Sequence, residues 1–238
     1  MKHTIFYSWQ SDRPPSSCRH FISGALKAAL KKISKGDVVY QFDQATERVS
    51  GTPDIAQTLF EKIEVASVAV FDVTPVSDGD GRQLPNPNVL IELGFAAKAI
   101  GWDRIILVMN KEFGGDPEGL PFDIRGRRFP VVYDGSTSGK KKALQDALSE
   151  FIPMAVAQLD VAVASALKKQ NSASMATLLA LMEKDNFAHN NEDNGINRLL
   201  DTDVLALGYD PATGKYSYHW TNLGQRLIAW CQDTSGKS

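Results

Sequence analysis

The chain has 238 residues, enough to bury one large core or a domain with a small additional module. With 43% apolar and 23% charged residues it has the composition of a globular protein, and its net charge of -2 argues against a general attraction to nucleic acid or anionic membranes. Two distant cysteines, Cys18 and Cys231, suggest no metal site and fit a reducing compartment. No targeting segment or run of about 20 apolar residues is evident, so we expect a soluble, cytoplasmic protein.

Strand and helix patterns alternate through the first two thirds of the chain. Between five β-rich apolar runs lie stretches with apolar residues at helical spacing. Nearly continuous apolar strands separated by helices are typical of a parallel sheet covered on both faces. We therefore predict a flavodoxin-like, doubly wound, five-stranded α/β domain over residues 1–153. The predicted strands are residues 4–9, 38–43, 67–74, 104–110 and 127–134.

The last third of the chain has a different pattern. We expect residues 154–172 to form a linker helix and residues 173–238 a small, mainly helical, winged-helix-like module. Helices over 175–186, 194–208 and 222–231 and a hairpin between the last two make up its predicted elements. From residue 165 onward, seven basic and eight acidic residues give a charge of -1, whereas a DNA reader should show a basic stripe. We therefore expect protein contacts, with DNA binding disfavoured.

Ligands of such α/β domains bind at the carboxyl ends of the strands. The run "FYSWQSD" (6–12) at the first strand end could contact the ribose or phosphates of a nucleotide, or be a loop in which Asp12 and Ser16 cap the next helix. Asp72, near the end of the third strand, could be a catalytic acid or a structural acid that bonds loop amides. We expect the polar residues at the strand ends to converge. They are Ser8, Trp9, Asp43, Asp72, Thr74 and the loop that leads to Glu92.

The segment "PNPNVLIELGFAAKAIG" (85–101) carries a single acid, Glu92, among apolar residues. Asn86 or Asn88 is expected to cap a helix here, with Pro87 in its first turn. Glu92 could serve the helix dipole, which favours an exposed acid. Its apolar neighbours and the small residues that follow favour a partly desolvated carboxylate at a pocket, of the kind found in active sites. No Walker-type, GxGxxG, HExxH, CxxC or nucleophile-elbow motif supports another class of enzyme.

Three segments resemble a bacterial TIR-like (Toll/interleukin-1 receptor) domain. They are "IFYSWQSD", "DIAQTLFEKIEVASVAVFDVT" and "PNPNVLIELGFAAKAIG", and the likeness covers about residues 3–150. The third segment resembles the "NV-x-x-E-L-G" helix start of prokaryotic TIR enzymes. It is also similar to the "E-L-G-x-A" segment of nucleoside deoxyribosyltransferases.

The resemblance implies an enzyme that cleaves the nicotinamide–ribose bond of NAD+, with Glu92 as the catalytic residue. NAD+ is then a substrate, and no cofactor is implied. Activity that depends on homo-oligomeric assembly, a partner protein and a role in antiphage defence also follow from the likeness, and residues 44–51 would form a lid. The expected substrate-binding residues are Ser8, Trp9, Asp43, Asp72 and Asn88. The alternatives are a non-catalytic adaptor that binds a nucleotide or a protein, and a nucleoside deoxyribosyltransferase-like enzyme.

Overall fold

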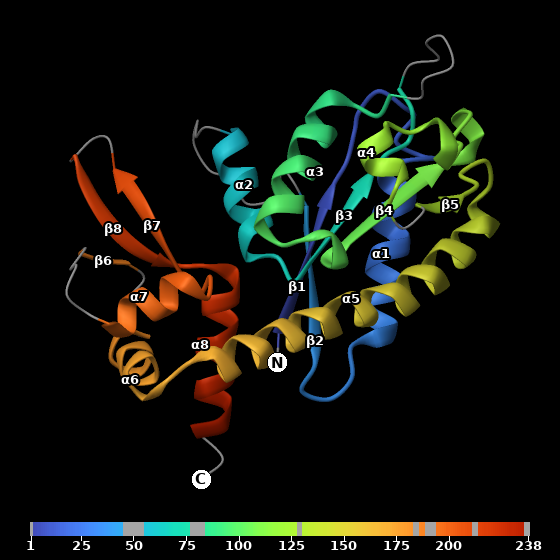
Figure 1. Ribbon diagram of the computed structural model, residues 1–238. Helices are drawn as coiled ribbons and strands as arrows, with labels where there is room; N and C mark the ends of the chain where they lie inside the picture. The colour runs from blue at the N-terminus through green and yellow to red at the C-terminus, as the bar shows by residue number, and fades with distance from the viewer. Residues whose placement is uncertain are drawn as a thin grey trace. The chain divides into compact units, whose positions relative to one another are not determined.

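The chain forms two compact units, Met1–Ala157 and Gln158–Ser238, whose elements are shown in Figure 1. The first unit ends close to residue 153, where the sequence pattern places the end of the α/β domain. The computed structural model describes residues 2–44, 55–76, 84–127, 130–182, 186–188, 194–210 and 214–235.

The first unit is built on a five-stranded sheet in the order β2-β1-β3-β4-β5, in which every neighbouring pair is parallel. The predicted parallel α/β sheet is therefore confirmed. The fifth strand is shorter than predicted: it begins after Pro130, which has no N–H to donate to a neighbouring strand. The strands are β1 (Lys2–Ser8), β2 (Val39–Gln44), β3 (Val68–Asp72), β4 (Ile105–Asn110) and β5 (Val131–Tyr133).

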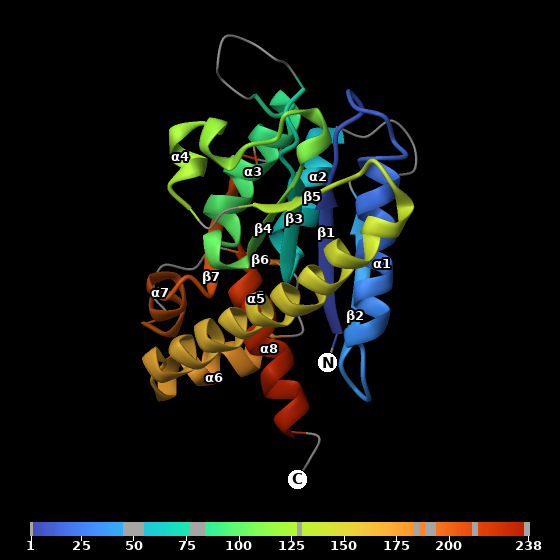
Figure 2. The same cartoon turned by 90° about the vertical axis from the view of Figure 1, so that its right-hand side faces the viewer.

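Helices cover both faces of this sheet (Figures 1 and 2). On one face α1 and α5 pack against the side chains of Ile5, Tyr7 and Val70, and on the other α2, α3 and α4 pack against Phe6 and Phe71. Successive strand residues thus enter opposite cores, which is why the strands read as continuous apolar runs. The helices are α1 (Arg19–Ile33), α2 (Ile55–Val65), α3 (Pro87–Ala99), α4 (Phe122–Arg125) and α5 (Lys141–Lys169), with short 3-10 turns η1 (Trp102–Arg104), η2 (Lys111–Phe113), η3 (Pro117–Gly119) and η4 (Ser138–Lys140).

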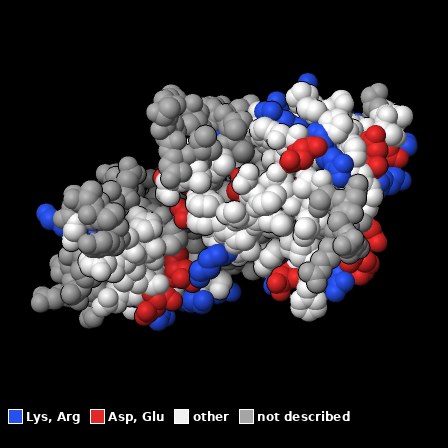
Figure 3. All heavy atoms as spheres, turned by 90° about the horizontal axis from the view of Figure 1, so that it is seen from above, with Lys and Arg blue, Asp and Glu red and all other residues white. Residues whose placement is uncertain are grey.

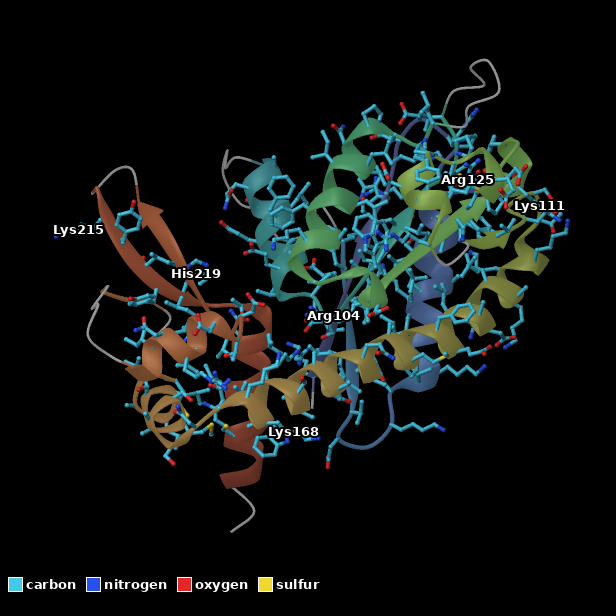
Figure 4. The ribbon with its side chains drawn as sticks, viewed as in Figure 1. Arg104, Lys111, Arg125, Lys168, Lys215 and His219 are labelled. Carbon is cyan, nitrogen blue, oxygen red and sulfur yellow. The ribbon has the colours of Figure 1, made fainter. Side chains whose placement is uncertain are left out.

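The strand order changes direction between β1 and β3. From β1 the chain passes to β2 on one side, and β3 then returns to the opposite side of β1. At such a change of direction the loops that follow the two inner strands diverge, and ligands of open α/β sheets bind there. Figure 4 marks the two edges of the sheet, with Arg104 at the amino end of β4 and Lys111 just after its carboxyl end.

Among the described residues one helix, α5, is long and apolar enough to cross a membrane. The linker helix expected over residues 154–172 is the second half of this helix. Its apolar residues serve two cores: Leu148 and Ile152 are buried in the first unit, and Leu159 and Val163 in the second. Of the most apolar 18-residue stretch of α5, 33% is buried. The structure is compatible with a soluble protein.

The second unit combines helices with a three-stranded antiparallel sheet in the order β6-β8-β7. Its core includes Leu178, Leu199, Tyr218 and Leu227. The β7–β8 hairpin carries Lys215 toward its tip and His219 toward its base (Figure 4). The elements after α5 are α6 (Ser172–Leu181), β6 (Asn186–Ala188), α7 (Asn194–Asp201), β7 (Leu205–Asp210), β8 (Lys215–Trp220) and α8 (Asn222–Ser235).

Two elements of this unit differ from the sequence prediction. The helix predicted over residues 194–208 ends at Asp201, and a strand, β7, follows it. Asp203 has a φ of 57°, a left-handed conformation that stops a helix. Leu205–Asp210 then pairs along β8, so cross-strand pairing overrides the helical spacing of its apolar residues. Strand β6 was not predicted.

The turn after β5 passes very close to the loop between β1 and α1. A Cβ atom at Gly135 would collide with the Ser17 carbonyl oxygen and with Asn110 Nδ2, whereas a Cβ at Gly139 would meet nothing within 4 Å. Both obstacles at Gly135 are held in the buried edge of the sheet, so they cannot move aside freely.

We predict that Gly135→Ala lowers the free energy of unfolding by about 2 kcal/mol or more, because an added methyl group overpacks this contact. Gly139→Ala is the matched control and should change stability by less than about 1 kcal/mol. Urea denaturation of the two variants measures the difference. Equal stabilities would contradict the close approach at Gly135.

Candidate functional site

Helix α3 begins abruptly at the carboxyl edge of the sheet. The Asn86 side chain accepts hydrogen bonds from the backbone N–H groups of Asn88 (2.8 Å) and Val89 (3.3 Å), and Pro87 occupies the first helical position. Of the two predicted caps, Asn86 is therefore the one used. Asn86 Nδ2 also donates to Asp12 Oδ2 at 2.6 Å, which fixes the helix start against the loop after β1.

Glu92 lies in the second turn of α3 with only 9% of its surface exposed. Burial raises the pKa of its carboxyl, and the Ser8 hydroxyl beside it offsets part of that rise. Neither Ser8 Oγ nor Glu92 Oε2 has a partner with hydrogen-bond geometry within the described part of the chain, so the two groups are neighbours without a formed bond. A buried acid does not suit a simple dipole role, which favours solvent. Glu92 Oε2 and Ser8 Oγ are therefore buried polar atoms whose bonding the described residues leave incomplete.

Asn88 precedes Glu92 by one helical turn. Residues four apart share one stripe of a helix, so Asn88 and Glu92 lie one above the other on α3. Asn88 is exposed and Glu92 is buried. The stripe therefore leads from the surface to the buried carboxyl, with Ser8 at its inner end.

Trp9 closes the carboxyl end of β1. Its ring packs against the core clusters on both faces of the sheet, and the guanidinium carbon of Arg19 lies 3.5 Å from the ring centroid. Trp9 Nε1 and Gln10 Nε2 are buried donors for which the described residues provide no acceptor. Gln10 lies beside the Asp72 carboxyl and offsets part of the rise in its pKa.

The loop between β1 and α1 is bonded to the segment that follows β3. Arg13 Nε donates to the Pro75 carbonyl oxygen just after β3 (2.7 Å), and the Arg13 N–H donates to Gln10 Oε1 (2.9 Å). The alternative in which Asp12 and Ser16 cap α1 is wrong, since the N-cap is Cys18 and no side chain bonds there. Asp12 instead bonds Asn86, because the adjacent α3 start offers an amide donor.

Asp72 points to the opposite face of the sheet from Ser8. Along β3, Val68 and Val70 belong to the α1–α5 core, and alternation puts Asp72 on that side. Its Oδ1 accepts from the Thr74 N–H (3.1 Å) and hydroxyl (2.5 Å), the geometry of a structural acid that bonds a loop amide. Burial nevertheless raises the pKa of Asp72 to about 6. Asp72 Oδ2 has no described partner.

Asn110, at the end of β4, joins four segments and was not singled out by sequence reasoning. Its Nδ2 donates to the Ser17 carbonyl (3.0 Å), and its Oδ1 accepts from the N–H groups of Glu112 (3.0 Å) and Gly135 (3.1 Å). Its own N–H donates to Thr74 Oγ1 at 3.0 Å. The only signal in the sequence is an amide that ends a wholly apolar strand.

Cys18 borders the same network but is not a nucleophile. The thiol is fully buried, and burial, followed by the nearby Asp72 charge, raises its pKa to about 11. A thiolate is therefore scarce at neutral pH. No group of three or more His, Cys, Asp or Glu among the described residues could hold a metal ion.

Asp43, the remaining expected site residue, is engaged elsewhere. Near the end of β2 it forms an ion pair with Lys62 of α2 at 2.9 Å, and Lys62 also donates to the Gln44 carbonyl. No contact joins Asp43 to Ser8 or Glu92 within the described ranges. The expected lid, residues 44–51, lies outside the described residues except for Gln44.

The structure thus brings Ser8, Glu92 and Asn88 to one side of the β1 end and sets Asp72 on the other. A cavity of about 160 Å³ lies elsewhere, toward the amino edge of β4, where Trp102, Ile105 and Arg127 line it. Seen from above, basic and acidic side chains are interspersed around an uncharged area of the first unit (Figure 3). On this face the described residues show no continuous basic surface of the kind that binds nucleic acid.

Comparisons with known proteins find no protein-family model that matches the chain and no curated protein that matches it. Function must therefore be argued from the residues and their geometry.

We predict that Asn110→Ala lowers the free energy of unfolding by about 3 kcal/mol, because buried groups of three segments lose their partner. Asn88→Ala removes an exposed amide and is the matched control, with an expected change below about 1 kcal/mol. Urea denaturation measures both. A small loss in Asn110→Ala would show that the loops at the carboxyl edge do not depend on this amide.

The pH dependence of stability in Asp72→Asn should test whether the pKa of the buried Asp72 carboxyl is raised. Because the pKa of Asp72 is higher in the folded state (about 6) than the ordinary 3.8, the wild type has its full stability below about pH 4 and loses up to about 3 kcal/mol of it as pH rises to about 7. Asparagine cannot ionise, so the stability of the variant relative to the wild type should rise by about the same amount between pH 4 and pH 7. Urea denaturation at several pH values measures it, with exposed Asp123→Asn as control. A difference that is constant with pH would contradict the elevated pKa.

Proposed function

We propose that this protein is a TIR-like NAD+ glycohydrolase that cleaves the nicotinamide–ribose bond, with Glu92 as the catalytic carboxylate. The observation that carries the proposal is the placement of Glu92: a buried carboxyl with an unpartnered oxygen, beside Ser8, at the carboxyl edge between β1 and β3. Burial of such a group without a bonded partner costs stability. A role toward a ligand accounts for that cost.

The chemistry requires only one carboxylate. When the bond between ribose C1′ and the ring nitrogen breaks, its electron pair goes to the cationic ring, and nicotinamide departs as a neutral molecule without a general acid. Positive charge develops on the ribose, and the Glu92 carboxylate stabilises it or captures C1′ covalently. Water then adds to C1′ and releases one proton, giving ADP-ribose.

The raised pKa of Glu92 is compatible with this role. A positive charge near a carboxyl favours the ionised form, and NAD+ carries that charge on the ring that leaves. Bound substrate would therefore lower the pKa of Glu92 toward its ordinary value and supply the carboxylate when it is needed. Ser8 already acts in the same direction.

The fold supports the proposal. Its strand order, β2-β1-β3-β4-β5, is that of flavodoxin-like domains. Such domains bind ligands beside the first strand, where the strand order changes direction. The resemblance of "PNPNVLIELG" to TIR enzymes selects the same glutamate. In this proposal Ser8, Trp9 and Asn88 bind the substrate, while Asp72 supports the loop from the far face and Asp43 remains paired with Lys62.

Assembly and biological role belong to the proposal through the resemblance. We expect activity to require homo-oligomers, to serve antiphage defence in the cytoplasm, and to be controlled by a winged-helix-like module in the second unit. On the hairpin of that unit Leu207 and Tyr216 are exposed apolar side chains, as expected of a surface that contacts protein. Activity per molecule should accordingly rise with protein concentration.

We predict that purified wild type at high concentration releases nicotinamide from NAD+, and that Glu92→Gln lowers the rate by at least about 100-fold, since the amide cannot stabilise the developing charge. Chromatographic quantification of nicotinamide measures the rate. Exposed Glu64→Gln on α2 is the matched control and should retain the wild-type rate.

If the wild type released no nicotinamide under any condition of assembly, the enzyme proposal would be wrong and the non-catalytic adaptor would be favoured. Unchanged nicotinamide release by Glu92→Gln would show that Glu92 is not the catalytic residue. A parallel incubation with a deoxynucleoside and a free base separates the deoxyribosyltransferase alternative, in which the same carboxylate would exchange bases and leave NAD+ intact.

A further inference from the structure

We infer that the exposed face of helix α5 is a docking surface for a second copy of this chain, and that the two α5 helices pack antiparallel across a two-fold axis. The inference deepens the proposed function by giving its assembly a surface, and it rests on that function only for the link between association and activity. The association itself is tested without NAD+.

Helix α5 carries more exposed apolar surface than a helix that only fills cores. It is long and apolar enough to cross a membrane, yet only 33% of its most apolar 18-residue stretch is buried. Met154 and Val161 are 48% and 63% exposed. Other residues of the helix, such as Ile152 and Leu159, already fill the cores of the two units. A second apolar face of the same helix is therefore left uncovered by the described part of the chain.

The exposed apolar residues form a stripe along α5. Its members follow one another at intervals of three, four and three residues: Met154, Ala157, Val161 and Ala164. This is the spacing of the apolar seam in a coiled coil, where two helices pack side by side along their length. All four residues belong to one continuous helix, so the helix itself sets their spacing.

The sizes of these side chains favour an antiparallel pair. When the two-fold axis passes midway between Ala157 and Val161, Met154 faces Ala164 of the second copy, and Val161 faces Ala157 of the second copy. Each layer of the seam then holds one large and one small side chain, which fills the space between the helices evenly. In a parallel pair each residue would face its own copy, and the two alanine layers would leave gaps.

Charge complementarity favours the same arrangement. Glu150 lies four residues before Met154 and Lys168 four residues after Ala164, so these two side chains continue the stripe at its ends. Both are exposed, neither forms an ion pair with another described residue, and Figure 4 labels Lys168 near the end of α5. In the antiparallel pair Glu150 of each copy faces Lys168 of the other. In a parallel pair like charges would face each other.

The sides of the stripe are compatible with close packing. Between Glu150 and Lys168 the one charged residue that flanks the seam is Asp160. Arg226 of α8 is close enough to interact electrostatically with Asp160 and offsets its negative charge. Repulsion between the two copies at the middle of the seam is reduced accordingly.

The test measures the association of the full chain by sedimentation-velocity centrifugation over a range of protein concentrations at low ionic strength. Because the seam is short, we expect a weak dimer with a dissociation constant of about 1–100 μM. Val161→Glu places a charge at the centre of the seam and should weaken the dimer by at least about 10-fold. Ala162→Glu is the matched control: Ala162 is exposed on the same helix outside the stripe, and this variant should associate like the wild type.

Charge reversal tests the antiparallel register. Glu150→Lys or Lys168→Glu alone sets like charges against each other at both ends of the seam and should weaken the dimer roughly 3- to 10-fold. The double variant Glu150→Lys/Lys168→Glu restores opposite charges and should associate about as tightly as the wild type. A parallel pair would show no such rescue, because its facing residues are identical in every variant.

Three results would overturn the inference: a wild type that stays monomeric up to about 1 mM, a Val161→Glu dimer as tight as that of the wild type, or charge variants without rescue. Binding of a monomeric wild type to vesicles of phosphatidylcholine and phosphatidylglycerol, lost in Val161→Glu, would also overturn it and assign the stripe to a membrane surface.

The proposed function can fail separately. A protein that dimerises through α5 but releases no nicotinamide from NAD+ would retain this interface and contradict the enzyme proposal. Where both hold, Val161→Glu should lower the nicotinamide release rate per molecule, and Ala162→Glu should leave it unchanged. Equal rates in the two variants would break the link between this interface and activity.

Discussion

The carboxyl edge of the first unit depends on the Asn110 side chain. The strands of a parallel sheet are not joined by hairpins, so the loops that leave them need other links. A carboxamide can donate and accept at once, and Asn110 uses this to connect Ser17, Glu112 and Gly135. Its backbone N–H reaches Thr74, which bonds Asp72. The ends of three strands and the start of α1 are thereby held in one buried network.

This network lies on the α1–α5 face, and Glu92 lies on the opposite face. Asp72 and Glu92 are both buried acids with a raised pKa, but they differ in how they are bonded. Asp72 Oδ1 is held by Thr74, whereas Glu92 has only the Ser8 hydroxyl beside it. Each of the two buried carboxyls keeps one oxygen without a hydrogen-bond partner among the described residues, and a ligand that completed such bonding would offset its cost.

The local pattern of apolar and polar residues was sufficient to predict much of the fold. It was not sufficient to predict the hydrogen-bond network around Asn110. The five parallel strands follow from apolar runs such as 67–74, and the cap at Asn86 from the Asn-Pro pair. The bond between Asn110 and Ser17 joins residues far apart in sequence, and no periodicity reports it. Strand β7 was missed because its apolar residues also fit a helix, and pairing with β8 decided the outcome. Glu92 could be singled out because an acid among apolar residues is a local anomaly.

The electrostatics of the edge are consistent with a cationic ligand. Trp9 presents a ring face that already binds a guanidinium, and Glu92 presents a carboxyl whose charge is disfavoured by burial. In the proposed function, a positive ring close to Glu92 would favour the ionised form of its carboxyl. Arg19 can supply positive charge to Trp9, but its place in the first turn of α1 fixes where that charge can lie. A substrate that brings its charge on the leaving group loses it at bond cleavage. The attraction would then vanish with the chemical step, and the neutral product would be released.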